Sequence, residues 1–298
     1  MERVARMDKP LDADFLKERA REAWKLLEAC SLCPRACGVD RVHGQIGFCR
    51  IGANAVVSSA FPHFGEERCI SGIAGSGTIF FSGCNLGCIF CQNYSISQGG
   101  EGEEMDYSLI ARLMLGLQQA GCHNLNLVTP SHIIPQILDA LALAAKKGFR
   151  LPIVYNSGGY DSLAELQLLD GVVDIYMPDF KYWESEAAER LSGAKDYPEI
   201  ARRAIKEMHR QVGDLIMDEN GIAKRGLLVR HLVLPNGFAG TKDVFRFLIE
   251  EISPCTHINV MGQYHPCWKS SECAEIDRPM RYSEILEAKQ LAKSLHLV

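Results

Sequence analysis

Six short apolar runs recur between about residue 75 and the end of the chain, and each leads into polar or glycine-rich sequence. Segments with the apolar spacing of amphipathic helices separate them. Strands that alternate with helices in this way predict an α/β fold with a parallel sheet, because each parallel connection needs a right-handed crossover. The predicted strands are residues 78–81, 124–128, 152–155, 172–177, 226–234 and 257–261.

Six strand–helix units fit a partial (β/α)6 barrel. A doubly wound open sheet is the alternative, because the order of strands along the chain does not fix their order in the sheet. We favour the barrel because polar sequence follows every strand, and the active sites of barrels gather on the loops after the strands. Helices are also predicted at residues 11–29 and 282–295, and Ser162 with Glu165 predicts a capping box at the start of another helix.

The first predicted strand leads into a run that holds Cys84, Cys88 and Cys91 in the spacing C-x3-C-x2-C. Thiolates select zinc, copper(I) or iron–sulfur centres. A four-iron cluster usually takes four cysteines, so three would leave one iron free to bind a cofactor or substrate. A zinc knuckle or a set of buried cysteines is the alternative. Cys69 is a conceivable fourth ligand, but it precedes the first strand and a glycine-rich segment separates the two.

A second group of cysteines lies near the N-terminus, in the spacing C-x2-C-x3-C-x11-C. Four close thiols predict a closed structural site for zinc or for an iron–sulfur cluster. A second iron–sulfur cluster that supplies electrons is an alternative. We therefore predict an N-terminal helix and four-cysteine metal-binding extension at residues 1–58, followed by the partial barrel at residues 59–298. The predicted ligands of the extension are Cys30, Cys33, Cys37 and Cys49.

Composition excludes several classes of partner. The chain has 298 residues, 47% of them hydrophobic and 23% charged, as in globular proteins with a buried core. Its net charge of −5, without a basic block, gives no support for a nucleic-acid partner. No apolar stretch suits a membrane helix, and residues 1–10 lack the apolar centre of a signal peptide. These features predict a cytoplasmic protein, in which twelve cysteines indicate metal sites before disulfides.

The three-cysteine motif resembles that of the radical S-adenosylmethionine (SAM) enzymes, which bind SAM at the free iron. Residues from about 60 to 295 further resemble a branch related to the activating enzymes of glycyl-radical proteins, as in pyruvate formate-lyase activation. This branch is similar in the stretch at residues 61–67, before the first strand. The other motifs that carry the resemblance are Asp179-Phe-Lys181, Tyr264-His265, Asn156-Ser-Gly158 and Arg230.

The resemblance implies a [4Fe–4S] cluster on the three cysteines and SAM on the loops after the later strands. Phe90 has an aromatic face suited to adenine, with core packing as the alternative. Arg230 and His231 alternate in direction, so only one of them can point into the barrel. The residues predicted around SAM, from the resemblance and from their place after strands, are Phe90, Cys91, Gln92, Thr129, Asn156, Ser157, Asp179, Lys181, Arg230 and His265.

One departure from the resemblance concerns the second strand. Enzymes of this kind usually carry Gly-Gly-Glu at its end, where backbone and acid hold the amino group of SAM. Residues 128–132 instead read Val-Thr-Pro-Ser-His and contain no acid. The amino group of SAM would then have to be held differently.

The predicted activity is reductive cleavage of SAM to methionine and a 5′-deoxyadenosyl radical, which abstracts hydrogen from a substrate. No side chain is identified as a conventional catalytic base, and the resemblance implies flavodoxin or ferredoxin as a low-potential electron donor. The first hypothesis for the substrate is a backbone glycine of a glycyl-radical enzyme. The second is a small molecule or peptide that is transformed directly. The third hypothesis is a non-catalytic iron–sulfur protein of electron transfer.

Overall fold

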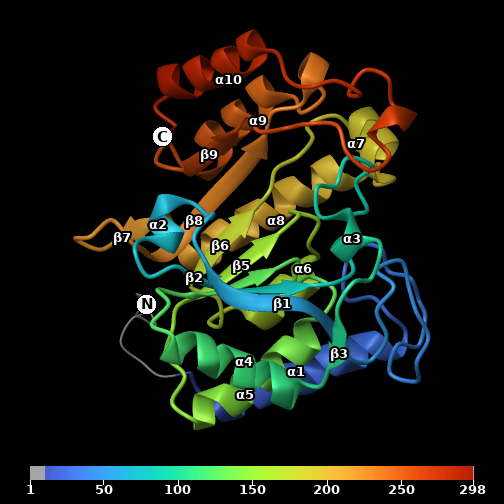
Figure 1. Cartoon of the computed structure of the whole chain (residues 1–298), viewed down its shortest axis with the longest axis vertical. Coiled ribbons are helices and arrows are strands. Elements are labelled where there is room, and N and C mark those ends of the chain that lie inside the picture. Colours follow the sequence, from blue (N-terminus) through green and yellow to red (C-terminus); the bar gives the residue numbers. More distant parts are fainter. Residues whose placement is uncertain (1–10, 298) are drawn as a thin grey trace.

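The computed structural model describes residues 11–297, so the charged segment at residues 1–10 considered above lies outside the described part. The described residues form a nine-stranded sheet in the order β3-β1-β2-β4-β5-β6-β8-β7, with β9 paired to β8 (Figure 1). The strands that run parallel are β2 (Ser76–Phe81), β4 (Leu125–Val128), β5 (Ile153–Ser157), β6 (Ile175–Pro178), β8 (Ala223–Leu232) and β9 (His257–Met261).

The parallel strands are neighbours in the same order in which they occur in the chain. A doubly wound sheet would reverse direction part of the way along, and this sheet does not. On its first side β2 is bordered by antiparallel β1 (Ala55–His63) rather than by β9, so the barrel stays open. The prediction of a partial barrel is therefore confirmed, and the doubly wound alternative is wrong.

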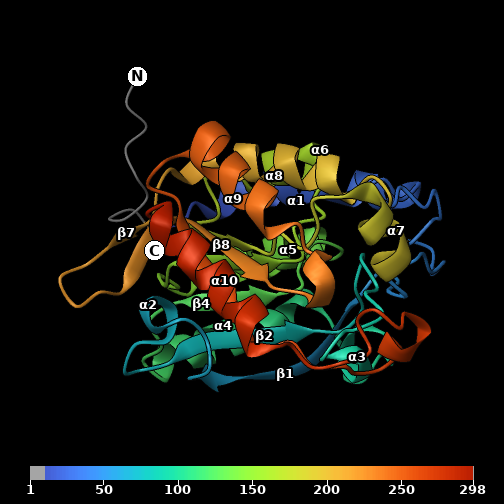
Figure 2. The ribbon, with the colours of Figure 1, turned by 90° about the horizontal axis from the view of Figure 1, so that it is seen from above.

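Helices α1, α6, α8 and α9 lie along one side of the curved sheet (Figure 2). Strands β1 and β2 lie on the opposite side of the molecule in this view. No helix within residues 11–297 is both long and apolar enough to cross a membrane. The helices are α1 (Ala13–Glu28), α2 (Arg68–Ser71), α3 (Tyr94–Ser97), α4 (Tyr107–Gln119), α5 (Ile134–Lys146), α6 (Leu163–Leu169), α7 (Ser185–Ser192), α8 (Tyr197–Val212), α9 (Thr241–Phe247) and α10 (Tyr282–Ser294).

Helix α1 packs along α5 in the helical layer of the barrel (Figure 1). Its predicted apolar face is buried, and its polar edge is fixed by Asp139 of α5, which accepts hydrogen bonds from Lys17 Nζ at 2.7 Å and Trp24 Nε1 at 2.8 Å. The boundary predicted near residue 58 falls inside β1.

Two local features differ from the sequence prediction. The strands β1, β3 (Glu103–Met105) and β7 (Ile216–Met217) are antiparallel additions to the barrel that the βαβ pattern does not predict. The capping box at α6 is only half formed. Ser162 Oγ accepts the hydrogen bond from the backbone N–H of Glu165 at 3.1 Å, but the Glu165 side chain is buried and accepts from Tyr155 instead.

An ion pair joins α10 to the loop before it and predicts a pH dependence. Arg278 lies 2.7 Å from Glu284 and lowers the pKa of Glu284 from its ordinary 4.5 to about 2. Because the pKa is lowered on folding, this stabilisation is present at neutral pH and is lost as the pH falls from about 4.5 to about 2. We expect the stability difference between the wild type and Glu284→Gln, measured by urea unfolding, to shrink across that range. A difference that does not change with pH would contradict this.

Candidate active site

The three-cysteine loop follows β2 at the carboxyl edge of the barrel. Its turn depends on Gly83 and Gly87, whose φ angles of +82° and +71° are favourable only for glycine. A Cβ atom on Gly83 would lie 2.5 Å from the carbonyl oxygen of Cys49, and one on Gly87 would lie 3.2 Å from the ring of Phe48. The loop therefore needs these glycines both to turn and to pack against the N-terminal cysteine segment.

Each of the three sulfur atoms has a polar neighbour. The backbone N–H of Leu86 donates to Cys84 Sγ at 3.3 Å, and the Ser192 hydroxyl donates to Cys88 Sγ at 3.1 Å. Cys91 Sγ lies 3.2 Å from the hydroxyl oxygen of Ser97. Hydrogen bonds to sulfur are one of the means by which a protein sets the potential of an iron–sulfur cluster.

The electrostatics of the loop favour a bound cationic centre. Burial, and next the neighbouring Cys88, raises the pKa of the Cys84 thiol to about 12. Burial and Cys88 also raise the pKa of Cys91, against the opposing effects of Ser97 and Lys181. A metal centre bound by Cys84 and Cys91 would hold both as thiolates, and its binding would release their protons.

The donor set fits a cluster better than a single ion. Within residues 11–297, no three Cys, His, Asp or Glu side chains converge as ligands of one metal ion. A four-iron cluster has its irons at separate corners, so its cysteines do not need to meet at one point. Three cysteine thiols, which leave one iron of the cluster without a protein ligand, therefore suit a four-iron cluster.

A row of charged and polar side chains faces the barrel interior at the ends of the later strands. Lys181 Nζ lies 2.6 Å from Asp179 Oδ2, and Arg230 Nε donates to Asp179 Oδ1 at 2.8 Å. Arg230 also donates to Asn156 Oδ1 at 2.7 Å. Burial alone would raise the pKa of Asp179, but Arg230 and Lys181 together lower it. Lys181 is close enough to Cys88 and Cys91 to interact with them electrostatically.

His231 lies on the opposite face of β8 from Arg230, as the alternation predicts. It is fully buried, and its ring nitrogens lie 2.7 Å from the carbonyl oxygen of Phe180 and 2.9 Å from the hydroxyl of Thr241. Burial lowers the pKa of His231 to about 4, so it is neutral and structural.

Two predicted SAM contacts have other surroundings. The Phe90 ring is only 5% exposed and makes edge contacts with Tyr182 and Tyr264, which favours core packing over adenine stacking. The Ser157 side chain points away from the face of Asn156, because neighbouring strand residues alternate. Its hydroxyl donates to buried Asp161 at 2.6 Å. Both side chains are therefore engaged elsewhere.

The remaining predicted contacts lie at the rim. Gln92 Nε2 is 3.3 Å from His265 Nδ1, which brings the cysteine loop and the loop after β9 together. Thr129 has a φ of +58°, an unusual value for a β-branched residue. Such strain is often kept at functional sites. Cys69 lies on α2, before β2 begins, and belongs to a separate apolar cluster with Val154 and Ile175, as expected for a cysteine that is not a ligand.

The N-terminal cysteine segment lies directly against the three-cysteine loop. Arg35, between Cys33 and Cys37, donates to the carbonyl oxygens of Asn85 at 2.8 Å and Leu86 at 3.0 Å. The same side chain donates to the carbonyl oxygens of Ser192 and Gly193. The two cysteine groups are thus neighbours in space, a proximity that their separation in the sequence does not indicate.

Arg41 marks an unusual electrostatic environment in this segment. It is 1% exposed, and no carboxylate within residues 11–297 forms an ion pair with it. Its contacts are the carbonyl oxygen of Gly52 at 3.1 Å and Cys30 Sγ at 3.9 Å. A buried cation needs a compensating anion. Metal-bound thiolates at Cys30 and Cys49 would supply this anion. Arg41 is close enough to Cys49 to oppose the rise that burial causes in the pKa of Cys49.

Sequence reasoning missed a group of polar residues inside the barrel. Glu66 and Glu67 follow β1 and reach inward, where Glu66 Oε1 accepts from Asn126 Nδ2 at 3.1 Å and Glu67 Oε1 accepts from Asn259 Nδ2 at 2.8 Å. Arg230 Nη1 lies 3.7 Å from Glu66 Oε2, which connects this group to the polar row. The two acids precede the first barrel strand, so a search of the loops after strands does not find them.

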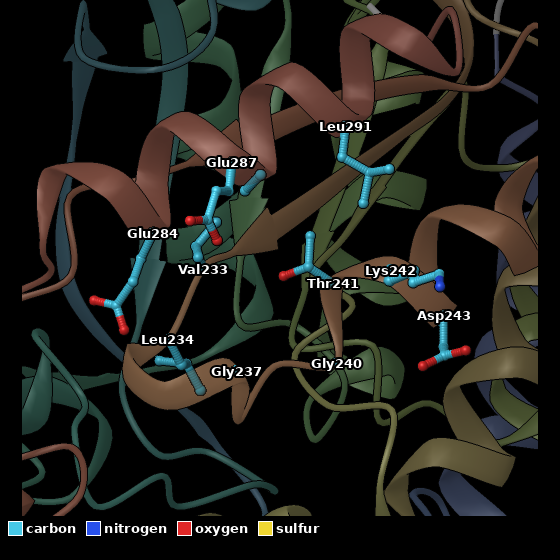
Figure 3. Close-up of a pocket in the computed structure, with 11 residues that line it drawn as sticks. Val233, Leu234, Gly237, Gly240, Thr241, Lys242, Asp243, Glu284, Glu287 and Leu291 are labelled. Carbon is cyan, nitrogen blue, oxygen red and sulfur yellow. The ribbon is translucent and has the colours of Figure 1, made fainter.

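A cleft of about 320 Å³ lies apart from these groups, between α10 and the segment from the end of β8 to the start of α9. Figure 3 shows Glu287 and Leu291 on α10 opposite Val233 and Thr241. None of the predicted site residues lines this cleft, so it is not part of the candidate active site.

The fold and the site together place the protein in a class of α/β proteins. Its barrel of parallel strands is open, and a three-cysteine loop suited to a metal centre lies at the carboxyl edge, beside a polar interior. Residues 78–218 match the Radical SAM superfamily. This match implies a [4Fe–4S] cluster and SAM as cofactors. The chain is also 35% identical to an uncharacterized protein of Methanocaldococcus jannaschii, over 97% of this chain and 80% of that protein.

Two solved structures are similar. A radical SAM methyltransferase from Sphaerobacter thermophilus is 15% identical with a TM-score of 0.50, and the alignment covers 74% of this chain and 64% of that one. Methylornithine synthase is 15% identical with a TM-score of 0.44, covering 94% of this chain and 69% of that one. The chain thus spans less than two thirds of the methyltransferase, whose likeness supports the fold alone.

Proposed function

We propose that this protein cleaves SAM reductively and uses the resulting radical to abstract hydrogen from a substrate bound inside the barrel. The observation that carries the proposal is the position of Cys84, Cys88 and Cys91, on the loop after the first barrel strand and beside the polar row. With a [4Fe–4S] cluster and SAM bound, the chemistry supplied is one-electron cleavage of SAM to methionine and a 5′-deoxyadenosyl radical.

The residues of the polar row would bind and orient SAM. Asp179, held ionised by Arg230 and Lys181, is an acceptor for hydroxyl or ammonium groups. Asn156 offers an amide whose oxygen already accepts from Arg230, which fixes its orientation. Gln92 and His265 together would close the rim, and the backbone of the Thr129 turn takes the place of the absent Gly-Gly-Glu sequence.

For the substrate, the barrel interior favours direct action on a small molecule or peptide group over a backbone glycine of a glycyl-radical enzyme. Glu66, Glu67, Asn126 and Asn259 line the interior with side chains able to recognise a polar ligand. A glycyl-radical partner would be supported instead if a large enzyme with such a loop stimulated SAM cleavage. A cytoplasmic setting with flavodoxin or ferredoxin as electron donor completes the proposal.

The test is anaerobic reconstitution with iron and sulfide, reduction, and an assay for 5′-deoxyadenosine in the presence of SAM. Formation of 5′-deoxyadenosine excludes the hypothesis of a non-catalytic electron carrier. A reconstituted protein that binds iron but neither binds nor cleaves SAM would refute the proposal.

We also propose that Cys30, Cys33, Cys37 and Cys49 hold a second metal centre, zinc or iron–sulfur; because no three described ligand side chains converge on one metal ion, the iron–sulfur cluster is favoured. The buried Arg41 without a carboxylate partner in the described part of the chain supports it, because metal-bound thiolates would balance its charge. We expect Cys33→Ala to lose about one zinc or about four irons per chain by elemental analysis. The matched control is Cys122→Ala, which removes an isolated buried thiol. Equal metal content in wild type and both variants would contradict the second site.

A further inference from the structure

The interior of the barrel contains polar side chains that are not among the proposed SAM contacts. Asn126 and Asn259 share the inner face with Arg230, since Asn126 donates to Glu66, which Arg230 contacts, and Asn259 pairs in register with Arg230. Glu66 and Glu67 enter this space from the loop after β1. The Glu66 side chain is 9% exposed, and Asn126 is fully buried.

Two of these side chains end in acceptors without a partner. Asn126 Oδ1 and Glu67 Oε2 are both buried and accept no hydrogen bond from any residue within 11–297. Leaving a buried acceptor unpaired is unfavourable. A ligand that donates hydrogen bonds to both would remove this cost.

The charges of the interior indicate a cationic donor. Three carboxylates, those of Glu66, Glu67 and Asp179, face two cations, Lys181 and Arg230, and both cations contact Asp179. One negative charge is therefore uncompensated when all three acids are ionised and His63, whose Nδ1 lies 3.5 Å from Glu66 Oε1, carries no charge. Burial raises the pKa of Glu66, with Arg230 opposing and Glu67 adding to the rise. An ammonium group offers the missing charge and three donors.

Aromatic rings form the neighbouring wall. Phe61 and Phe80 stack at a centroid distance of 5.7 Å across β1 and β2, and the His63 ring meets both of them edge-on. Phe61 pairs in register with Thr78, and Thr78 pairs with Asn126, so these side chains lie on the inner face as well. Ring faces of this kind attract cations.

We propose that Glu67 and Asn126 bind a protonated primary amine of the substrate inside the barrel. This inference rests on the proposed function, because it assigns a substrate class to the same interior. The acids lie on a loop that precedes the barrel strands, and Arg230 connects Glu66 to the polar row that is proposed to bind SAM.

The test is isothermal titration of the reconstituted protein with butylamine, in the presence of SAM and without reductant. We expect butylamine to bind and butanol, which lacks the charge, not to bind. Glu67→Gln should weaken butylamine binding by about tenfold or more, because it removes a charge-assisted hydrogen bond. Glu67→Asp, which keeps the charge, should lose less. The matched control is Glu103→Gln, on exposed β3.

Three results would overturn the proposal: equal binding of butylamine and butanol, equal binding by wild type and Glu67→Gln, or amine binding that SAM abolishes. The last result would mean that the acids hold the amino group of SAM. Because the titration involves no turnover, it is independent of the 5′-deoxyadenosine assay. Amine binding without SAM cleavage refutes only the proposed function, and cleavage without amine binding refutes only this inference.

Discussion

Replacing Cys88 with alanine is expected to abolish formation of 5′-deoxyadenosine and to remove about four irons per chain. Cys88 lies between the other two cysteines, receives the hydrogen bond from Ser192, and raises the pKa of Cys84 and Cys91 by its proximity. With two ligands left, the cluster has no stable attachment. Iron and sulfide analysis together with the 5′-deoxyadenosine assay measure both effects.

The control for this variant is Cys255→Ala, because Cys255 is an exposed cysteine outside both cysteine groups. It should retain the iron content of the wild type. Unimpaired SAM cleavage by Cys88→Ala would show that the three-cysteine loop is not the site of the chemistry, and the proposed function would fall with it.

Replacing Asp179 with alanine should cause the largest loss of stability among single changes in the polar row. Asp179 is buried and is the shared partner of Lys181 and Arg230, whose side chains are only 16% and 18% exposed. Without it two like charges face each other in a medium of low polarity, which costs about 3–5 kcal/mol. The midpoint of thermal unfolding should fall by roughly 6–15 °C, measured by circular dichroism.

Two further variants identify the cause. Asp179→Asn fills the same volume and should be destabilised as well, because the charge is what is missing. Asp243→Ala removes the carboxylate of an exposed ion pair with Arg246 and should cost only about 0.2–1 kcal/mol. If all three variants unfold at the same temperature, Asp179 does not balance the two cations.

The sequence predicts the parallel barrel well because its signals are local. Apolar runs followed by polar residues mark the strands, and the cysteine spacing marks the loop after the first of them. Asp179, Lys181 and Arg230 can be grouped in advance because the carboxyl ends of parallel strands meet at one edge. The alternation of strand residues separates Arg230 from His231, as the structure confirms.

What could not be predicted depends on contacts between distant segments. For Phe90 the sequence leaves adenine stacking and core packing both open, and it is the distant Tyr182 and Tyr264 that favour core packing. Ser157 is drawn to Asp161 on the far side of the strand. Glu66 and Glu67 enter the barrel because antiparallel β1 borders β2, and the βαβ pattern carries no information about that strand.

The hydrogen bonds of Arg35 have a consequence for the biosynthesis of the protein. They join the N-terminal cysteine segment to the three-cysteine loop and to the carbonyl oxygens of Ser192 and Gly193. The pocket around the three thiols is therefore complete only after α7 has left the ribosome. Until then the nascent chain carries the thiols of the two cysteine groups without these contacts, so a cluster on the three-cysteine loop would be held in its complete pocket only after α7 has been synthesised.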